Sequence, residues 1–130
     1  MILTGRQSLR TSQLTMLIFG FLIFAFGLLG LLAPALLPQL LFFPPKPGGY
    51  TNLFIQASAQ ASLAMGSYYL LAGWFNMRLF MWLSVPVRLV NTIVFSAMVL
   101  KDLAPLGWLV VALLELVGAT LTYLTLRKEE

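Results

Sequence analysis

Apolar residues fill four long stretches of this chain, and turn-forming or charged residues separate them. The stretches run from about residues 14 to 32, 52 to 73, 79 to 100 and 106 to 126. Each holds about 20 residues, which is the length that a helix needs to cross a hydrocarbon core of about 30 Å. The pattern predicts an all-α fold, an integral membrane antiparallel four-helix bundle that occupies residues 1–130 as a single domain.

The loop between the first two stretches, residues 33–50, holds five of the seven prolines. Proline has no amide hydrogen, so no regular helix crosses this loop. Its many Leu and Phe side chains favour a position in the membrane interface, as a connector or cap. The alternatives are a lid over a site and a docking surface for another subunit. The first stretch is longer than the apolar region of a signal peptide, so we expect it to remain as an anchor.

Small and polar residues recur on one face of each predicted helix. Helices in a bilayer associate through small residues that allow close approach and polar residues that need partners, so we expect these faces to point inward. The second helix should then be the most enclosed, and the first should make most of the lipid contact. The faces comprise Gly20, Gly27 and Gly30; Asn52, Gln56 and Gln60 beside Ala57, Ala61 and Ala64; Ser84, Arg88 and Asn91; and Ala112, Glu115, Gly118, Ala119 and Thr122.

The composition supports a membrane protein and excludes most enzyme chemistry. Apolar residues make up 60% of the chain and charged residues 9%, whereas soluble domains carry about 25% charged residues. The chain has no Cys and no His, which excludes disulfides, thiol nucleophiles, Cys/His zinc sites and His-ligated haem. It also lacks a phosphate-binding loop and a catalytic triad. We expect no metal, no cofactor and no enzymatic activity, with Glu115 as the one candidate acid or base.

The eight basic residues indicate membrane topology. They are spread along the chain, unlike the patch of a nucleic-acid-binding protein, so we expect no nucleic acid partner. Basic residues concentrate on the cytoplasmic side of membrane proteins. Both termini are therefore predicted to be cytoplasmic, because one side of the predicted spans holds Arg6, Arg10, Arg78, Arg127 and Lys128, whereas the other holds only Lys46 and Lys101.

The eighth basic residue, Arg88, lies about 15 Å inside the predicted third span. A basic side chain at such a depth costs about 2.5–3.5 kcal/mol to insert, so it needs a partner. Counting residues back from the hairpin turn places Glu115 opposite the polar face of the third helix. We expect Glu115 to accept a bidentate guanidinium contact together with a hydrogen bond from Asn91. Gln56 or Gln60 would satisfy the donors or acceptors that remain.

Three interpretations of this polar cluster are open. A buried ion pair can simply fix which helix lies against which. Alternatively, Arg88 anchors the anionic head group or carboxylate of a ligand, since an ionisable residue inside a membrane marks a functional site by default. A conduction or proton path is the third interpretation, although one acid and one base do not make a relay.

Residues 67–72 have the sequence SYYLLA, followed by a short basic turn and then by an arginine inside the third span. This layout resembles that of small four-helix bacterial membrane proteins of the DoxX-like and domain-of-unknown-function type. The resemblance covers the second to fourth spans. It implies a multi-pass protein of the bacterial inner membrane, but it implies no settled activity and no functional residue.

Two functions are consistent with the sequence. The first is a non-catalytic accessory or assembly component, or a self-associating bundle, whose partners are membrane lipids and other membrane proteins or a second copy. The absence of catalytic side chains beside many small-residue faces favours it. The alternative is a binder or carrier of a lipid or another amphiphilic small molecule, in which Arg88 and Glu115 supply the polar contacts.

Overall fold

The computed structural model describes residues 9–40, 49–102, 104 and 106–130, and the regular elements in that part of the chain are all α-helices. The predicted all-α fold is thus confirmed. The long helices begin and end within a few residues of the four predicted stretches. The proline-rich loop was predicted to hold no regular helix, but a short helix of five residues lies within it. The helices are α1 (Thr11–Leu32), α2 (Leu36–Leu40), α3 (Gly49–Trp74), α4 (Arg78–Leu100) and α5 (Trp108–Lys128).

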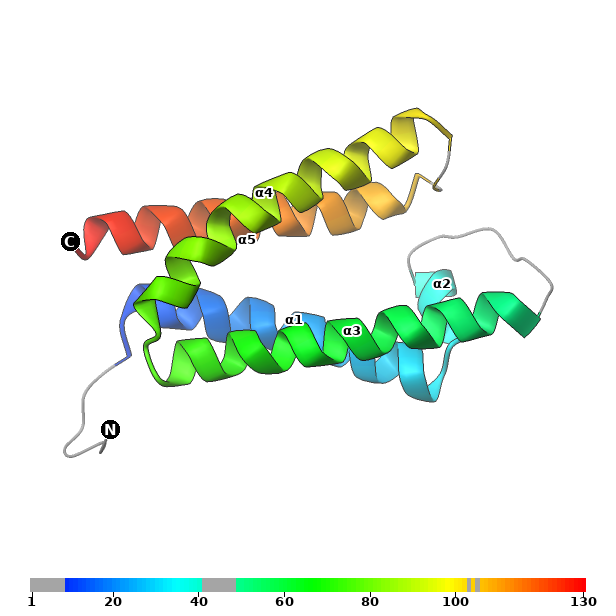
Figure 1. Cartoon of the computed structure of the whole chain (residues 1–130), viewed down its shortest axis with the longest axis horizontal. Helices are drawn as coiled ribbons and strands as arrows, with labels where there is room; N and C mark the ends of the chain where they lie inside the picture. The colour runs from blue at the N-terminus through cyan, green and yellow to red at the C-terminus, as the bar shows by residue number, and fades with distance from the viewer. Residues whose placement is uncertain (1–8, 41–48, 103, 105) are drawn as a thin grey trace.

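The long helices form two antiparallel hairpins (Figure 1). In the first hairpin α1 packs along α3, and in the second α4 packs along α5. The beginning of α1, the end of α5 and the turn between α3 and α4 all lie at one end of the molecule, which we call the terminal end. Helix α2 and the connection between α4 and α5 lie at the opposite, far end. Residues 41–48 of the proline-rich loop lie outside the described residues.

The turn between α3 and α4 is a helix C-cap in which Asn76 adopts a left-handed conformation, with φ of 51°. The backbone amide of Met77 donates to the carbonyl of Ala72 over 2.9 Å. This 6→1 bond around a left-handed residue is typical of the Schellman motif, and Asn tolerates that conformation better than most residues. The turn therefore ends α3 sharply and lets α4 begin at Arg78.

Glycines bring the backbones of α1 and α3 into direct contact. A Cβ atom on Gly27 would lie 2.5 Å from the backbone nitrogen of Leu63, and one on Gly66 would lie 2.5 Å from that of Phe24. Only glycine fits at either position without a shift of the neighbouring helix. The predicted small-residue face of α1 is confirmed, since Gly20, Gly27 and Gly30 are all buried.

The hydrophobic core lies between the two hairpins near the terminal end. It is built from buried side chains of all four long helices, with Ile23, Phe80 and Trp82 packed against it. Tyr69 of α3 meets Phe80 of α4 edge to face, with ring centroids 5.9 Å apart. The buried members are Met16, Tyr69, Ala72, Met81 and Leu126.

The expectation that the second predicted span is the most enclosed and the first the most exposed was wrong. Helix α1 packs against both α3 and α5, whereas α3 packs along α1 and contacts α4 much less. The outer face of α3 leaves Ala57, Ser58, Gln60 and Ala61 exposed. The sequence expectation failed because close approach to α1 uses the face of α3 with Ala59, Gly66 and Gly73, which turns the neighbouring polar positions outward.

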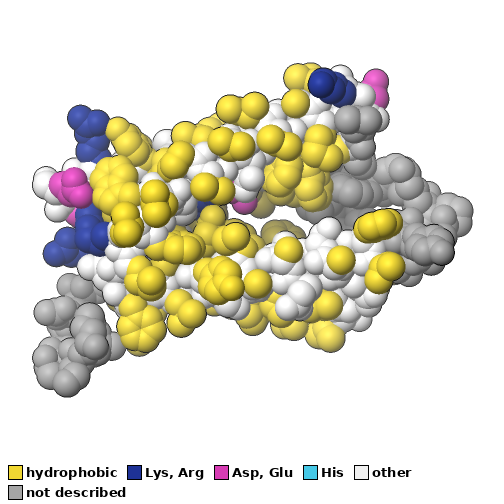
Figure 2. Space-filling view, viewed as in Figure 1, with side chains coloured by type: hydrophobic (Ala, Val, Ile, Leu, Met, Phe, Trp, Pro, Cys, Tyr) yellow, Lys and Arg dark blue, Asp and Glu magenta, His cyan; other side chains and the backbone are white. Residues whose placement is uncertain are grey.

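Three helices of the described chain are long and apolar enough to cross a membrane: α1, α4 and α5. Helix α3 is longer, with 26 residues. Its sequence includes Gln56, Gln60 and several serines, which lower its hydropathy below that of the other three. Large apolar side chains are exposed along the hairpins, as Figure 2 shows.

Candidate functional site

Arg88 lies where the four long helices meet, and only 1% of its surface is exposed. It shares the inward face of α4 with Ser84, which is also buried. Gly118 of α5 makes room for the arginine head, because a Cβ atom at position 118 would overlap the guanidinium group. The predicted inward orientation of the polar faces of α4 and α5 is confirmed, since Ala112, Gly118, Ala119 and Thr122 are buried as well.

Two aromatic rings, a hydroxyl group and a thioether sulfur surround the guanidinium. Its Nη1 donates to Thr122 Oγ1 over 3.2 Å and lies 4.0 Å from Met16 Sδ. The guanidinium carbon lies 5.4 Å from the ring centre of Phe19 and 5.0 Å from that of Tyr69. Cation–π attraction acts within about 6 Å and strengthens where water is excluded. Arg88 of α4 is therefore held by side chains of α1, α3 and α5.

The Glu115 carboxylate is the acidic partner of Arg88, but the contact is long. Arg88 Nε lies 4.0 Å from Glu115 Oε2, and neither atom has a hydrogen-bond partner within the described residues. Asn91 lies beside the same carboxylate. The expected bidentate contact was wrong, and the direction in which helical side chains lean explains why.

A side chain leans toward the N-terminus of its own helix. Helices α4 and α5 are antiparallel, so their side chains lean in opposite directions. Arg88 leans toward the terminal end and reaches Thr122, which lies two turns beyond Glu115. Glu115 leans toward the far end, and its side chain keeps 15% of its surface exposed.

The structure places Gln56 and Gln60 away from this pair. Gln56 Nε2 donates to the backbone carbonyl of Leu31 over 3.3 Å, within the first hairpin. Gln60 is exposed on α3. The sequence analysis instead missed Met16, Phe19 and Tyr69 as neighbours of Arg88, because apolar side chains on other helices carry no signal of their own. Thr122 and Gly118 could have been found, since both lie on the predicted inward face of α5.

A second polar cluster fastens the helices together at the terminal end. The Glu129 carboxylate accepts hydrogen bonds from the amide of Ser12 over 3.0 Å, from Ser12 Oγ over 2.6 Å and from Arg78 Nη1 over 2.9 Å. Nearby, Gln13 Nε2 donates to the carbonyl of Gly73 over 2.8 Å. We call Ser12, Gln13, Arg78 and Glu129 the terminal clamp. The sequence analysis missed this cluster, because Glu129 lies in a short charged tail of the kind that is usually solvated.

The terminal clamp makes stability depend on pH. Burial of Glu129 opposes its ionisation, but the bonds from Ser12 and the charge of Arg78 outweigh it and hold the pKa of Glu129 below its ordinary value. A depressed pKa gives stability above about pH 4.3, the unfolded value, and this stability is lost as the pH falls through the lower folded value.

We expect Glu129→Gln to lower stability by about 1 kcal/mol at neutral pH, because the neutral amide replaces a charged acceptor. The difference from the parent protein should shrink as the pH falls below 4.3. Thermal unfolding in one detergent across this range measures it. Glu130→Gln is the matched control, since Glu130 lies 3.9 Å from Arg78 and is mostly exposed. An unchanged difference at low pH would contradict the assignment.

Within the described residues, no three His, Cys, Asp or Glu side chains gather as metal ligands would. The fold and the buried cluster together define a class: an all-helical chain with three helices long and apolar enough to cross a membrane, arranged around one buried arginine. Comparisons with protein-family models, curated proteins and solved structures gave no match. The resemblance to DoxX-like proteins therefore stays a prediction.

Proposed function

We propose that this chain is a non-catalytic integral membrane protein that acts as an accessory or assembly component by associating with a second copy or another membrane protein. In this proposal all four long helices cross the inner membrane of a bacterial cell, and both termini lie in the cytoplasm. The apolarity of α1, α4 and α5 supports insertion. The gathering of Arg78, Arg127 and Lys128 at the terminal end supports the orientation, because cytoplasmic ends are rich in basic residues.

The main support for association is the exposed outer face of α3. Gln60 and Ser58 are exposed there, next to the exposed Ala57 and Ala61. Lipid tails offer no hydrogen-bond partner to an amide or hydroxyl group, whereas a neighbouring helix does. The two alanines allow such a helix to approach closely. A partner helix that covers this face would satisfy Gln60 and also help α3, the least apolar long helix, to stay in the membrane.

Cysteine crosslinking tests this association directly, because the natural chain has no cysteine. Ala61→Cys is expected to form a crosslink in native membranes, either to a second copy or to a different membrane protein. Leu113→Cys is the matched control, since Leu113 is a residue of α5 with 59% of its surface exposed. It should give no specific product.

A monomeric Ala61→Cys protein with no crosslinked partner would contradict the association. That result would favour the second candidate function, a binder of an amphiphilic molecule between the hairpins. The observation behind this alternative is that Arg88 Nε and Glu115 Oε2 both lack hydrogen-bond partners within the described chain. Figure 2 shows a hollow between the two hairpins, which such a molecule would occupy.

A further inference from the structure

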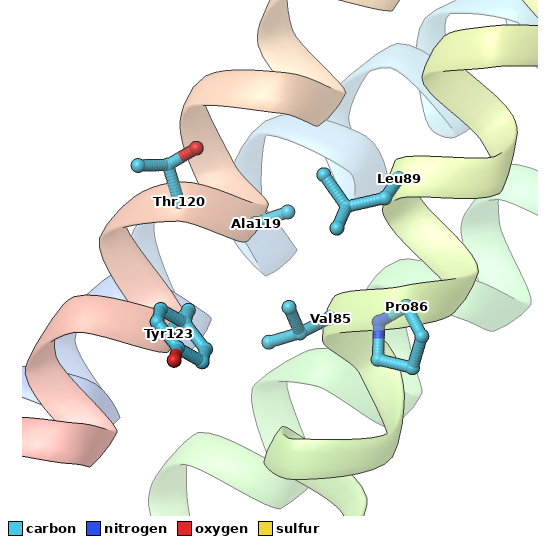
Figure 3. Close-up of a pocket in the computed structure, with 6 residues that line it drawn as sticks. All are labelled: Val85, Pro86, Leu89, Ala119, Thr120 and Tyr123. Carbon is cyan, nitrogen blue, oxygen red and sulfur yellow. The ribbon is translucent and has the colours of Figure 1, made fainter.

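An apolar groove runs between α4 and α5 on the outside of the second hairpin (Figure 3). Its volume is about 270 Å³. Val85 and Ala119 are buried and form its floor, whereas Pro86, Leu89, Thr120 and Tyr123 are exposed and form its walls. Pockets that enclose a small molecule usually measure about 300–1,000 Å³. The groove therefore suits a chain that lies along the surface better than an enclosed ligand.

The end of the groove nearest the terminal end is polar. The Tyr123 hydroxyl accepts a hydrogen bond from Arg127 Nη1 over 2.8 Å. Trp82 packs edge to face on the Tyr123 ring, with centroids 5.9 Å apart, and its Nε1 donates to Glu130. Tyr and Trp prefer the boundary between hydrocarbon and head groups. The groove thus passes from an apolar floor to an aromatic pair and then to a cation.

Arg127 keeps an uncompensated charge. Glu129 is occupied by Ser12 and Arg78 of the terminal clamp, and Glu130 accepts from Trp82. Across the described chain, no ion pair joins Arg127 to a carboxylate. A guanidinium group offers paired donors that match the oxygens of a phosphate. Its charge and its place at the end of an apolar groove complement a molecule with one anionic head and one apolar tail.

We propose that this groove binds a phospholipid with an anionic head group. One acyl chain lies over Val85 and Ala119, and the phosphate lies against Arg127 and the Tyr123 hydroxyl. This site rests on the proposed membrane insertion, with the terminal end in the cytoplasmic leaflet. It lies on the second hairpin and is independent of the outer face of α3.

Lipid retention by the full-length chain tests the proposal. The protein is purified in mild detergent, supplied with phosphatidylglycerol or phosphatidylcholine of identical acyl chains, and examined by native mass spectrometry. Phosphatidylglycerol should be retained preferentially. Arg127→Gln should weaken its retention by about tenfold, the loss expected for a charge-assisted hydrogen bond. Lys128→Gln is the matched control and should have little effect, because Lys128 is the neighbouring exposed cation and makes no contact with the groove.

A second pair of variants tests the groove itself. Thr120→Trp should fill it and reduce the retention of both lipids, whereas Leu121→Trp, at an exposed site on another face of α5, should not. Equal retention of the two lipids, equal effects of Arg127→Gln and Lys128→Gln, or full retention by Thr120→Trp would overturn the lipid site.

Failure of membrane insertion is distinguishable from failure of the lipid site. The same protein is mixed with vesicles, washed with alkaline carbonate and floated on a density gradient. Protein that does not float contradicts both the insertion and the lipid site. Protein that floats but shows no preference for phosphatidylglycerol contradicts the lipid site alone.

Discussion

Glu115→Leu is expected to destabilise the protein by about 3–5 kcal/mol, the cost of removing one partner of a buried ion pair. Arg88 is 1% exposed, and Glu115 is its acidic partner at 4.0 Å. A guanidinium group does not lose its proton in proteins, so the variant would bury an uncompensated charge. Arg88→Leu should cost less, because the carboxyl group that it leaves behind is partly exposed and can take up a proton.

The double variant Arg88→Leu with Glu115→Leu should be more stable than either single variant, since it strands neither charge. Thermal unfolding of all three proteins in one detergent measures this order. Gln39→Leu is a suitable control, because Gln39 is an exposed polar residue of α2 at the far end. If the stability losses of the two single variants instead add up in the double variant, Arg88 and Glu115 do not interact.

Gly66→Leu is expected to push α3 away from α1 and to cost about 3 kcal/mol, at the upper end of the usual range for overpacking. A Cβ atom at this position would already lie 2.5 Å from the backbone nitrogen of Phe24. Neither backbone can give way without parting the helices. The gain in helix propensity from replacing glycine is only about 1 kcal/mol, so the steric term decides.

Ala25→Leu is the matched control for Gly66→Leu. Ala25 is exposed on α1, so a larger side chain there meets no other helix. Thermal unfolding should show little change for Ala25→Leu and a large loss for Gly66→Leu. Equal unfolding temperatures for the two variants would show that α1 and α3 do not depend on close backbone contact.

The sequence predicted the helices well because apolar length, proline and turn residues are local signals. It also predicted which faces of α4 and α5 point inward, since a polar residue such as Ser84 or Thr122 needs a partner away from lipid. The same rule failed for α3. The polar face of a membrane helix can pack against helices of the same chain or against another molecule. The same residue types serve both contacts, so the sequence does not distinguish them.

The geometry around Arg88 was harder to predict for a different reason. Counting residues from a hairpin turn gives the relative height of two Cα atoms, but not the direction in which their side chains lean. A long side chain such as arginine moves its charge by more than one helical turn, which is why Thr122 is its hydrogen-bond partner. The rings of Phe19 and Tyr69 could be assigned to Arg88 only once the position of α1 and α3 was known.

The contacts between the two hairpins have an unequal distribution. The terminal clamp joins them at one extremity, and the bond between Thr15 and Thr122, 3.0 Å long, lies a little further in. Arg88 marks the deepest of the polar and aromatic contacts described between them. A rotation of one hairpin relative to the other would therefore pivot at the terminal end. It would widen or narrow the gap between the hairpins at the far end, where α2 lies.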